Sequence, residues 1–181
     1  PVVVTGAAGG VGSMAVMLLA RDGWSVTAVT GRPEEAERLR QLGAAEVIGR
    51  DPFAGAVKPL ARERWAAALD TVGSTMLAHV LSMLKPGGVA IACGNAAGMD
   101  LPASVAPFIL RGVSLIGVDS VRMPTAHREA IWPHLAESVD RDRLAAMTRV
   151  IGLPDAIDAA RRIVDGAIAG RTVVTVGDLG H

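Results

Sequence analysis

The feature that most constrains the fold lies within the first twelve residues. An apolar, β-branched run at residues 2–5 (VVVT) is followed by a glycine-rich stretch at 6–12 (GAAGGVG), and an apolar helical pattern covers 13–20. A strand, a glycine turn and a helix in this order form a nucleotide-binding unit. The turn lets the backbone approach a diphosphate, and the helix N-terminus carries partial positive charge. Because both flanks are present, we predict a nucleotide site here rather than a glycine turn without a ligand.

The glycine spacing narrows the class of nucleotide-binding protein. Matched to G-x-G-x-x-G, the three defining positions are Ala7, Gly9 and Gly12, so alanine replaces the first glycine while a tight turn remains possible. Residues 5–12 also fit the turn of short-chain dehydrogenases. Those enzymes need a tyrosine as general acid, and this sequence contains no tyrosine, so that active site is excluded.

Strand and helix patterns alternate along most of the remaining chain. Such alternation predicts a Rossmann-type, doubly wound α/β fold with a parallel six-stranded sheet of order 3-2-1-4-5-6. Residues 51–64 read as loop plus a short helix. The other expected strands are 25–30, 46–49, 66–72, 89–93 and 113–118, and the expected helices are 33–42, 74–84 and 125–139.

The last part of the chain has a different character. We expect a nucleotide-binding domain over residues 1–143 and a strand-helix-strand segment over 144–181, with elements at 148–151, 154–169 and 171–176. These elements either finish the same sheet or pack on a neighbouring domain. The first strand begins at residue 2, directly after Pro1, so we expect the chain to be a portion of a longer protein.

Composition excludes several classes of function. Eighteen basic and eighteen acidic residues give no net charge, so no basic field recruits nucleic acid. No apolar run approaches the roughly 18 residues of a membrane span, and without a signal peptide we expect a cytoplasmic location. The single cysteine, Cys93, rules out a disulfide framework and a cysteine-based zinc site, and the four histidines lack ligand spacing, so no metal is expected.

Some isolated polar residues have a structural interpretation beside the functional one. Cys93 is expected to be a small buried hydrophobe rather than a reactive thiol. Asp70 orients a ligand or caps the loop after its strand. His79 and His134 lie on expected helices, where a surface or packing role is favoured over catalysis.

The tip of the second strand decides which dinucleotide fits. An acidic residue at this place binds the ribose 2′-hydroxyl of NAD, whereas an arginine accommodates the 2′-phosphate of NADP. Here the tip is Thr30, Gly31 and Arg32, with no acid; Glu34 and Glu35 are the competing interpretation, but we expect them inside the next helix, facing solvent. Arg50, after the neighbouring strand, is placed to close over the same phosphate, or is a solvated charge. We therefore predict NADP(H).

Several motifs together resemble one known family. They are VVVTGAAGGVG at 2–12, TGR at 30–32, RD at 50–51, LDTVG at 69–73, LKPGG at 84–88, ACGNAAG at 92–98 and PFILRGVSLIGVDSV at 107–121. This set resembles the zinc-independent quinone oxidoreductases of the medium-chain dehydrogenase/reductase superfamily, and within them it is most similar to the acrylyl-CoA reductase branch. The resemblance covers residues 2–176.

The resemblance implies NADPH-dependent reduction of an activated carbon–carbon double bond in a small molecule, an enoyl thioester or a quinone. It implies diphosphate contacts at Ala8, Gly9, Gly10 and Val11, and 2′-phosphate contacts at Thr30, Gly31 and Arg32 with Arg50 beside them. Asn95 and Ala96 would lie near the nicotinamide ribose, Asp119 and Ser120 near the nicotinamide end, and Arg171 is a further candidate. Asn95 stands where the family has an apolar residue.

The same resemblance implies that such enzymes carry a β-rich catalytic domain ahead of the nucleotide-binding half. Catalytic residues would come from that domain, so none is named in this chain, and residues 144–181 would return to it. A non-enzymatic NAD(P)-binding sensor or interaction module is the alternative. An exposed edge at the sixth strand (113–118) also predicts a homodimer, because an unpaired edge invites pairing.

Overall fold

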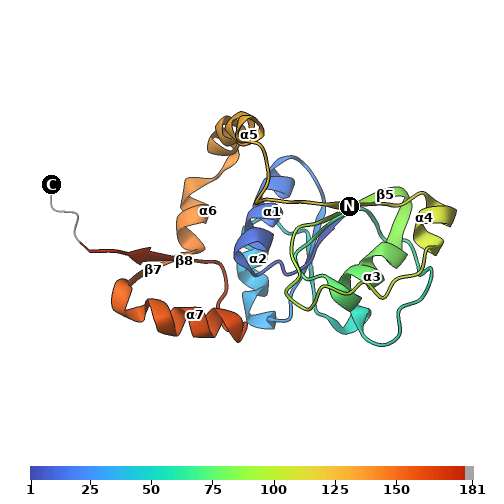
Figure 1. The fold of residues 1–181 in the computed structure, drawn as a ribbon, viewed down its shortest axis with the longest axis horizontal. Helices are drawn as coiled ribbons and strands as arrows, with labels where there is room; N and C mark the ends of the chain where they lie inside the picture. Colours follow the sequence, from blue (N-terminus) through green and yellow to red (C-terminus); the bar gives the residue numbers. More distant parts are fainter. Residues whose placement is uncertain (178–181) are drawn as a thin grey trace.

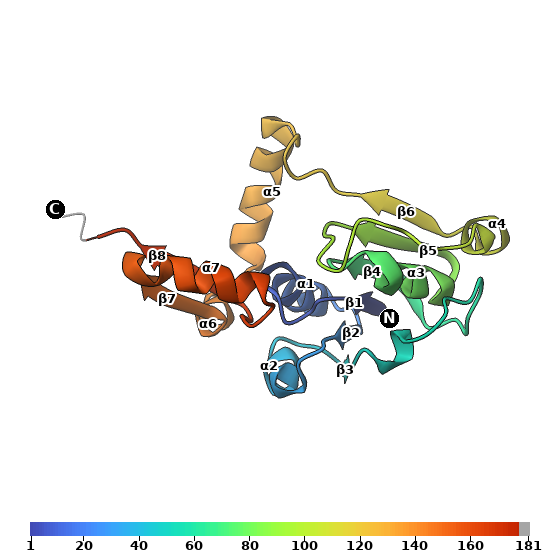
Figure 2. The ribbon, with the colours of Figure 1, turned by 60° about the horizontal axis from the view of Figure 1, so that its bottom comes forward.

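A six-stranded parallel sheet forms the centre of the computed structural model, which describes residues 1–177. The predicted order is confirmed, with β1 between β2 and β4. Figure 1 shows the whole fold, and Figure 2 labels the six strands in this order. Across the sheet the strands are β3 (Glu46–Ile48), β2 (Val26–Val29), β1 (Val2–Val4), β4 (Trp65–Asp70), β5 (Leu84–Ala92) and β6 (Ser114–Gly117).

Helices cover both faces of this sheet, as a doubly wound fold requires. Alternate residues of β1 point to opposite faces, so Val2 and Val4 join one buried cluster and Val3 joins the other. The first cluster includes side chains of α1 (Gly10–Arg21) and α2 (Ala36–Gln41), and the second those of α3 (Ser74–Met83) and α4 (Ala106–Arg111). The glycine turn thus leaves the most buried strand of the molecule.

Three local elements differ from the sequence-based expectation. β5 starts at Leu84, which pairs with Trp65, and the register shifts before Val89 pairs with Ala67, so residues 85–88 bulge rather than precede the strand. Helices α4 and α6 (Arg141–Ala146) were not predicted. Each has six residues, too short for an apolar period to stand out.

The C-terminal elements form a unit of their own. β7 (Thr148–Gly152) and β8 (Arg171–Thr175) make a separate two-stranded parallel sheet, so the alternative in which they finish the main sheet is wrong. Helix α7 (Ala156–Val164) is shorter than the predicted 154–169, because Gly166 at φ +67° ends it. Figure 2 shows this unit beside α1.

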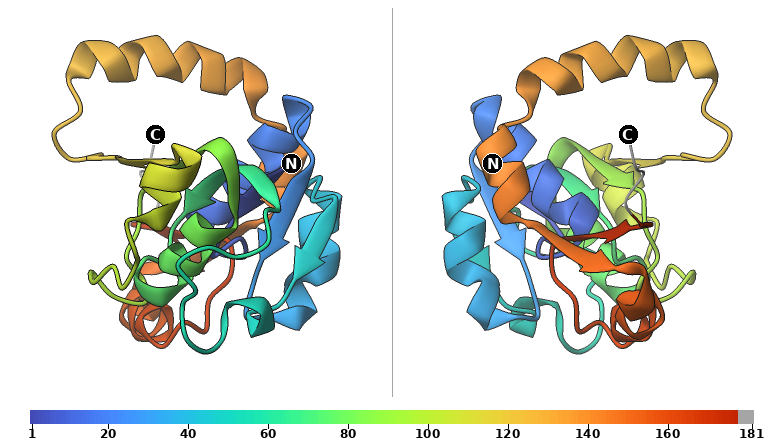
Figure 3. Two further views of the ribbon diagram at one scale, coloured as in Figure 1. Left: turned by 90° about the vertical axis from the view of Figure 1, so that its right-hand side faces the viewer. Right: turned by 90° about the vertical axis from the view of Figure 1, so that its left-hand side faces the viewer.

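The remaining segments connect these units. The predicted 125–139 helix is α5 (Thr125–Ser138), which arches along one side of the molecule in Figure 3. Short 3₁₀ turns occur at η1 (Pro33–Glu35), η2 (Asp51–Phe53) and η3 (Leu153–Asp155). Within residues 1–177, every helix is too short or too polar to cross a bilayer.

A buried carboxylate joins the ends of β1 and β4. The fully buried Asp70 accepts a hydrogen bond from Thr5 Oγ1 (2.6 Å) and another from the Gly73 amide (2.7 Å). Thr5 Oγ1 in turn accepts one from the Thr71 amide (3.1 Å). Burial raises the pKa of Asp70, and the bonds from Thr5 and Gly73 partly oppose that rise. Of the two roles considered for Asp70, the structure supports the cap of the loop after its strand.

Thr5→Val tests this interaction, since it removes the hydroxyl while keeping the side-chain shape. At a pH above the raised pKa of Asp70, where the carboxyl is charged, we expect the free energy of unfolding to fall by about 2 kcal/mol, because a hydrogen bond to a charged group contributes about 1.5–3 kcal/mol. With a raised folded pKa, the wild type loses stability as pH rises from 3.8, the ordinary value, through that pKa. Below pH 3.8 the carboxyl is neutral, so the effect of Thr5→Val is smaller.

Urea unfolding at the two pH values measures this difference. Thr71→Val is the matched control, because its hydroxyl bonds the Thr5 carbonyl (3.0 Å) and not the Asp70 carboxylate. An equal loss for Thr5→Val at both pH values would show that the hydroxyl does not stabilise the charge.

Candidate functional site

The candidate site follows from the parallel direction of the six strands. Their carboxyl ends meet at one edge, so the predicted residues lie along it in order: Arg50 after β3, residues 30–32 after β2, 8–11 after β1, 95–96 after β5 and 119–120 after β6. The connections diverge between β1 and β4, which is where ligands bind in such folds. With about 4.8 Å between strands, the tip of β2 lies roughly 14 Å from the end of β5.

The geometry of the glycine turn explains the alanine in its pattern. The left-handed conformation falls on Gly6 (φ +58°), one residue before Ala7, so Ala7 needs no positive φ. Gly12 sits so close to the Gly6 carbonyl and to Ala7 Cα that a Cβ atom would overlap both. The turn and the first turn of α1 are therefore in direct backbone contact.

The N-terminus of α1 is open to an anion. Its cap residue is Gly9, no side chain of the described structure caps it, and its first turn holds no acidic residue. The Arg171 guanidinium lies beside it, with Nη2 3.9 Å from where a Cβ of Gly10 would stand. The Gly9 amide donates to the Gly6 carbonyl (2.9 Å), so the donors left free among the described residues include the amides of Gly10 and Val11 and the Arg171 cation, a set that suits a diphosphate.

The tip of β2 lies beneath the guanidinium of Arg50. Thr30 is buried, and its Oγ1 accepts a hydrogen bond from the Arg32 amide (3.1 Å). The Arg50 guanidinium lies over Gly31, with Nε 2.5 Å from the place of a Cβ, so a side chain at residue 31 would displace Arg50 from this position. Beside them is a cavity of about 440 Å³, lined by Thr30, Gly31, Pro33, Ala36, Val47, Ile48, Gly49, Arg50 and Asp51.

The side chain of Arg32 turns toward the C-terminal unit. Its Nη1 donates to the Ile168 carbonyl (2.8 Å), and its Nη2 donates to the Gly166 carbonyl. A guanidinium has five N–H donors, so three remain for a ligand. Arg32 is half-buried between the β2 tip and residues 166–168 rather than solvated.

A further arginine supports the turn, and sequence reasoning missed it. Arg38 on α2 pairs with Glu35 (Nε to Oε2, 2.5 Å) and donates from Nη2 to the Ala8 carbonyl (3.2 Å) and from Nη1 to Ser13 Oγ (3.2 Å). Glu34 is exposed as expected, whereas Glu35 is half-buried in this ion pair. A single arginine on a charged helix shows no periodic signal that marks it for such a contact.

The loops after β5 and β6 hold the other predicted residues, and here contacts are local. Asn95 and Ala96 are exposed, and the Ala96 amide donates to the Thr71 carbonyl (3.4 Å). Asp119 Oδ1 accepts hydrogen bonds from the backbone amides of Val121 (3.0 Å) and Arg122 (3.1 Å) in the same loop. The Ser120 carbonyl accepts a bond from Arg128. Residues 119–120 follow β6, the outermost strand on one side of the sheet, three strands from β1.

Cys93 and the helical histidines have defined environments. Cys93 is exposed, so the expectation of a buried hydrophobe is wrong. The cause is that Cys93 lies just after the end of β5, at the carboxyl ends of the parallel strands. Partial burial of its sulfur, and the charge of Asp70, raise the pKa of the thiol, which disfavours the reactive thiolate. His79 is buried against Phe53, and His134 is exposed.

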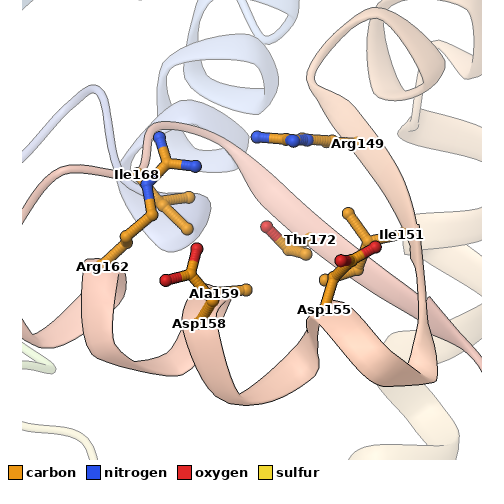
Figure 4. Close-up of a pocket in the computed structure, with 8 residues that line it drawn as sticks. All are labelled: Arg149, Ile151, Asp155, Asp158, Ala159, Arg162, Ile168 and Thr172. Atoms are coloured by element: carbon orange, nitrogen blue, oxygen red, sulfur yellow. The ribbon is translucent and has the colours of Figure 1, made fainter.

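A second cavity, of about 160 Å³, lies between α7 and the β7–β8 sheet (Figure 4). Its lining has charges of both signs, so it favours neither anions nor cations: Arg149, Ile151, Asp155, Asp158, Ala159, Arg162, Ile168 and Thr172. Across residues 1–177, no three or more histidine, cysteine, aspartate or glutamate side chains gather as a metal site would require.

Comparison with known proteins finds similar sequences and similar solved structures among oxidoreductases. The chain is 49% identical over 177 residues to acrylyl-CoA reductase AcuI of Ruegeria pomeroyi, covering 97% of this chain and 54% of that protein. The structure of the yhdH oxidoreductase from Salmonella enterica in complex with NADP superposes with a TM-score of 0.94 at 45% identity, covering 97% of this chain and 54% of that one. Bacillus subtilis protein yhfP with NAD bound gives 0.90 at 42%, covering 97% and 54%.

These relatives agree with the resemblance drawn from the motifs. The chain spans about half the length of the curated relatives it matches. The family model for zinc-binding dehydrogenases matches residues 10–137. The chain therefore belongs to the zinc-binding dehydrogenase family, within the medium-chain dehydrogenase/reductase superfamily.

Proposed function

We propose that this chain is the NADP(H)-binding portion of an oxidoreductase that reduces an activated carbon–carbon double bond, in an enoyl thioester or a quinone. The observation that carries the proposal is the β2 tip, where Arg32 and Arg50 flank Gly31 and no acidic side chain occupies the tip. The NADP complex of the relative from Salmonella enterica supports it.

Within this proposal each group has a defined task. The turn at residues 8–11 binds the diphosphate, through the amides that the Gly9–Gly6 hydrogen bond leaves free and with the Arg171 guanidinium. The β2 tip binds the 2′-phosphate, with Arg50 closing over it. The loops with Asn95 and Asp119 receive the nicotinamide half. When bound, NADPH supplies the hydride that reduces the double bond. We assign no residue of this chain to proton transfer or to the charge that develops on the substrate.

We further propose a homodimer through the free edge of β6. Ile116 and Val118 are 49% and 41% exposed there, and a second copy pairing with this edge would extend the sheet. No feature of residues 1–177 favours the non-enzymatic sensor, so the reductase remains the proposal.

Arg32→Ala tests the coenzyme preference. A charge-assisted hydrogen bond contributes about 1.5–3 kcal/mol, so we expect NADP⁺ affinity to fall at least tenfold while NAD⁺ affinity changes by less than about twofold. Isothermal titration calorimetry with both coenzymes measures the two dissociation constants. An equal loss for both would refute a 2′-phosphate contact at Arg32.

Arg171→Ala should behave differently from Arg32→Ala, because NAD⁺ and NADP⁺ share the diphosphate. We expect affinity for both to fall by a similar factor, about tenfold, and the loss to shrink as salt rises. Arg149→Ala is the matched control, since Arg149 lies in the cavity behind β7 rather than at α1. Unchanged affinity in Arg171→Ala would remove this residue from the site.

The dimer is tested by placing a charge on the β6 edge. Ile116→Lys should convert the dimer to a monomer in multi-angle light scattering, because two lysines would then oppose each other across paired edges. Trp24→Lys, at another exposed apolar position, serves as the control and should leave the dimer intact. A monomeric wild type at high concentration would contradict the proposal.

A further inference from the structure

Residues 166–171, here called the crossing segment, connect α7 to β8 and lie against the coenzyme turn. The Gly170 amide donates to the Ala8 carbonyl (2.9 Å), and Gly9 and Gly170 form an isolated parallel bridge. Nearer the start of the segment, the carbonyls of Gly166 and Ile168 accept hydrogen bonds from the Arg32 guanidinium. The segment therefore touches both the diphosphate end and the 2′-phosphate end of the proposed site.

The direction of these carbonyls is set by the end of α7. Gly166 adopts a left-handed conformation (φ +67°), the Ala167 amide donates to the Arg162 carbonyl (2.8 Å), and the Gly166 amide donates to the Ile163 carbonyl (3.0 Å). This is the Schellman arrangement, which ends a helix in one defined geometry. The backbone that follows α7 therefore has a fixed direction, and the Gly166 and Ile168 carbonyls point toward Arg32 at the end of β2.

The opposite end of the segment is held equally closely. Gly170 is also left-handed (φ +66°), a Cβ on it would overlap the Met147 carbonyl, and that carbonyl accepts a bond from the Arg171 amide (2.9 Å). Between the two ends, Ile168 lines the cavity shown in Figure 4. Both ends of the segment are thus bound to the rest of the fold.

A fixed segment changes what Arg32 can contribute. A free arginine at a loop tip loses rotamer freedom when it binds phosphate, about 0.5–1.5 kcal/mol per side chain, and this weakens binding. Two carbonyls hold its terminal nitrogens, so the guanidinium is kept in one orientation, and three of its five N–H donors are not used by these two bonds. Pre-orientation of this kind favours the ligand that uses the arginine over the one that does not.

We propose that the crossing segment determines coenzyme selectivity, by holding Arg32 in the orientation that receives the 2′-phosphate. This inference rests on the proposed function of Arg32. The positioning groups are backbone carbonyls of Gly166 and Ile168, so the segment contributes to NADP(H) preference without touching the coenzyme through a side chain.

Gly166 offers a sharp test with a matched control. Gly166→Ala strains the left-handed position without a steric clash, since no heavy atom lies within 4 Å of the added Cβ. Gly166→Asn adds a larger side chain that tolerates this conformation. We expect Gly166→Ala to lower NADP⁺ affinity about fivefold with NAD⁺ affinity unchanged, and Gly166→Asn to retain the wild-type values.

Calorimetry on Gly166→Ala, Gly166→Asn, Arg32→Ala and the Arg32→Ala/Gly166→Ala double variant completes the experiment, with circular dichroism to verify that each is folded. If the segment acts through Arg32, Gly166→Ala has no further effect once Arg32 is removed. An equal loss for both coenzymes, no loss, a gain in NADP⁺ affinity, or an undiminished effect in the Arg32→Ala background would each overturn the inference. Failure of the proposed 2′-phosphate site is recognised separately, by an unselective Arg32→Ala.

Discussion

The position of the proposed diphosphate-binding amides depends on the backbone contact between Gly12 and Gly6. With no side chain at residue 12, the first turn of α1 lies directly on the turn that leaves β1, and the amides at the helix start face the crevice. Any Cβ at residue 12 would push the helix away from the turn. The Thr5–Asp70 hydrogen bond then fixes this turn to β4, on the other side of the point where the strand order diverges.

Much of this architecture is predictable from the sequence, because it depends on short-range patterns. The β-branched run at 2–5, the glycine spacing and the alternation of strands with helices lead to the observed sheet order. Helices of six residues, such as α4 and α6, are not predicted because too few apolar positions repeat within them. The bulge at 85–88 is not predicted for another reason, because a register shift depends on the partner strand as well as on local turn residues.

The candidate site was predictable only in part. The sequence indicates which residues follow which strands, and parallel strands bring them to one edge, so Thr30, Gly31 and Arg50 are found together. It does not indicate where a long side chain ends. Arg38 reaches back to the turn, and Arg32 reaches residues 136 positions away in the chain, contacts that arise from tertiary packing alone.

The bridge between Gly9 and Gly170 has a consequence for the order of assembly during folding. Neighbouring strands β1 and β2 pair across one short crossover, whereas the bridge joins the two ends of the described chain and closes a very long loop. Contacts of such high sequence separation are entropically expensive to form early. The central sheet can therefore be complete while the turn still lacks its last backbone partner, and the crevice acquires that partner only when residues 166–171 pack against the turn.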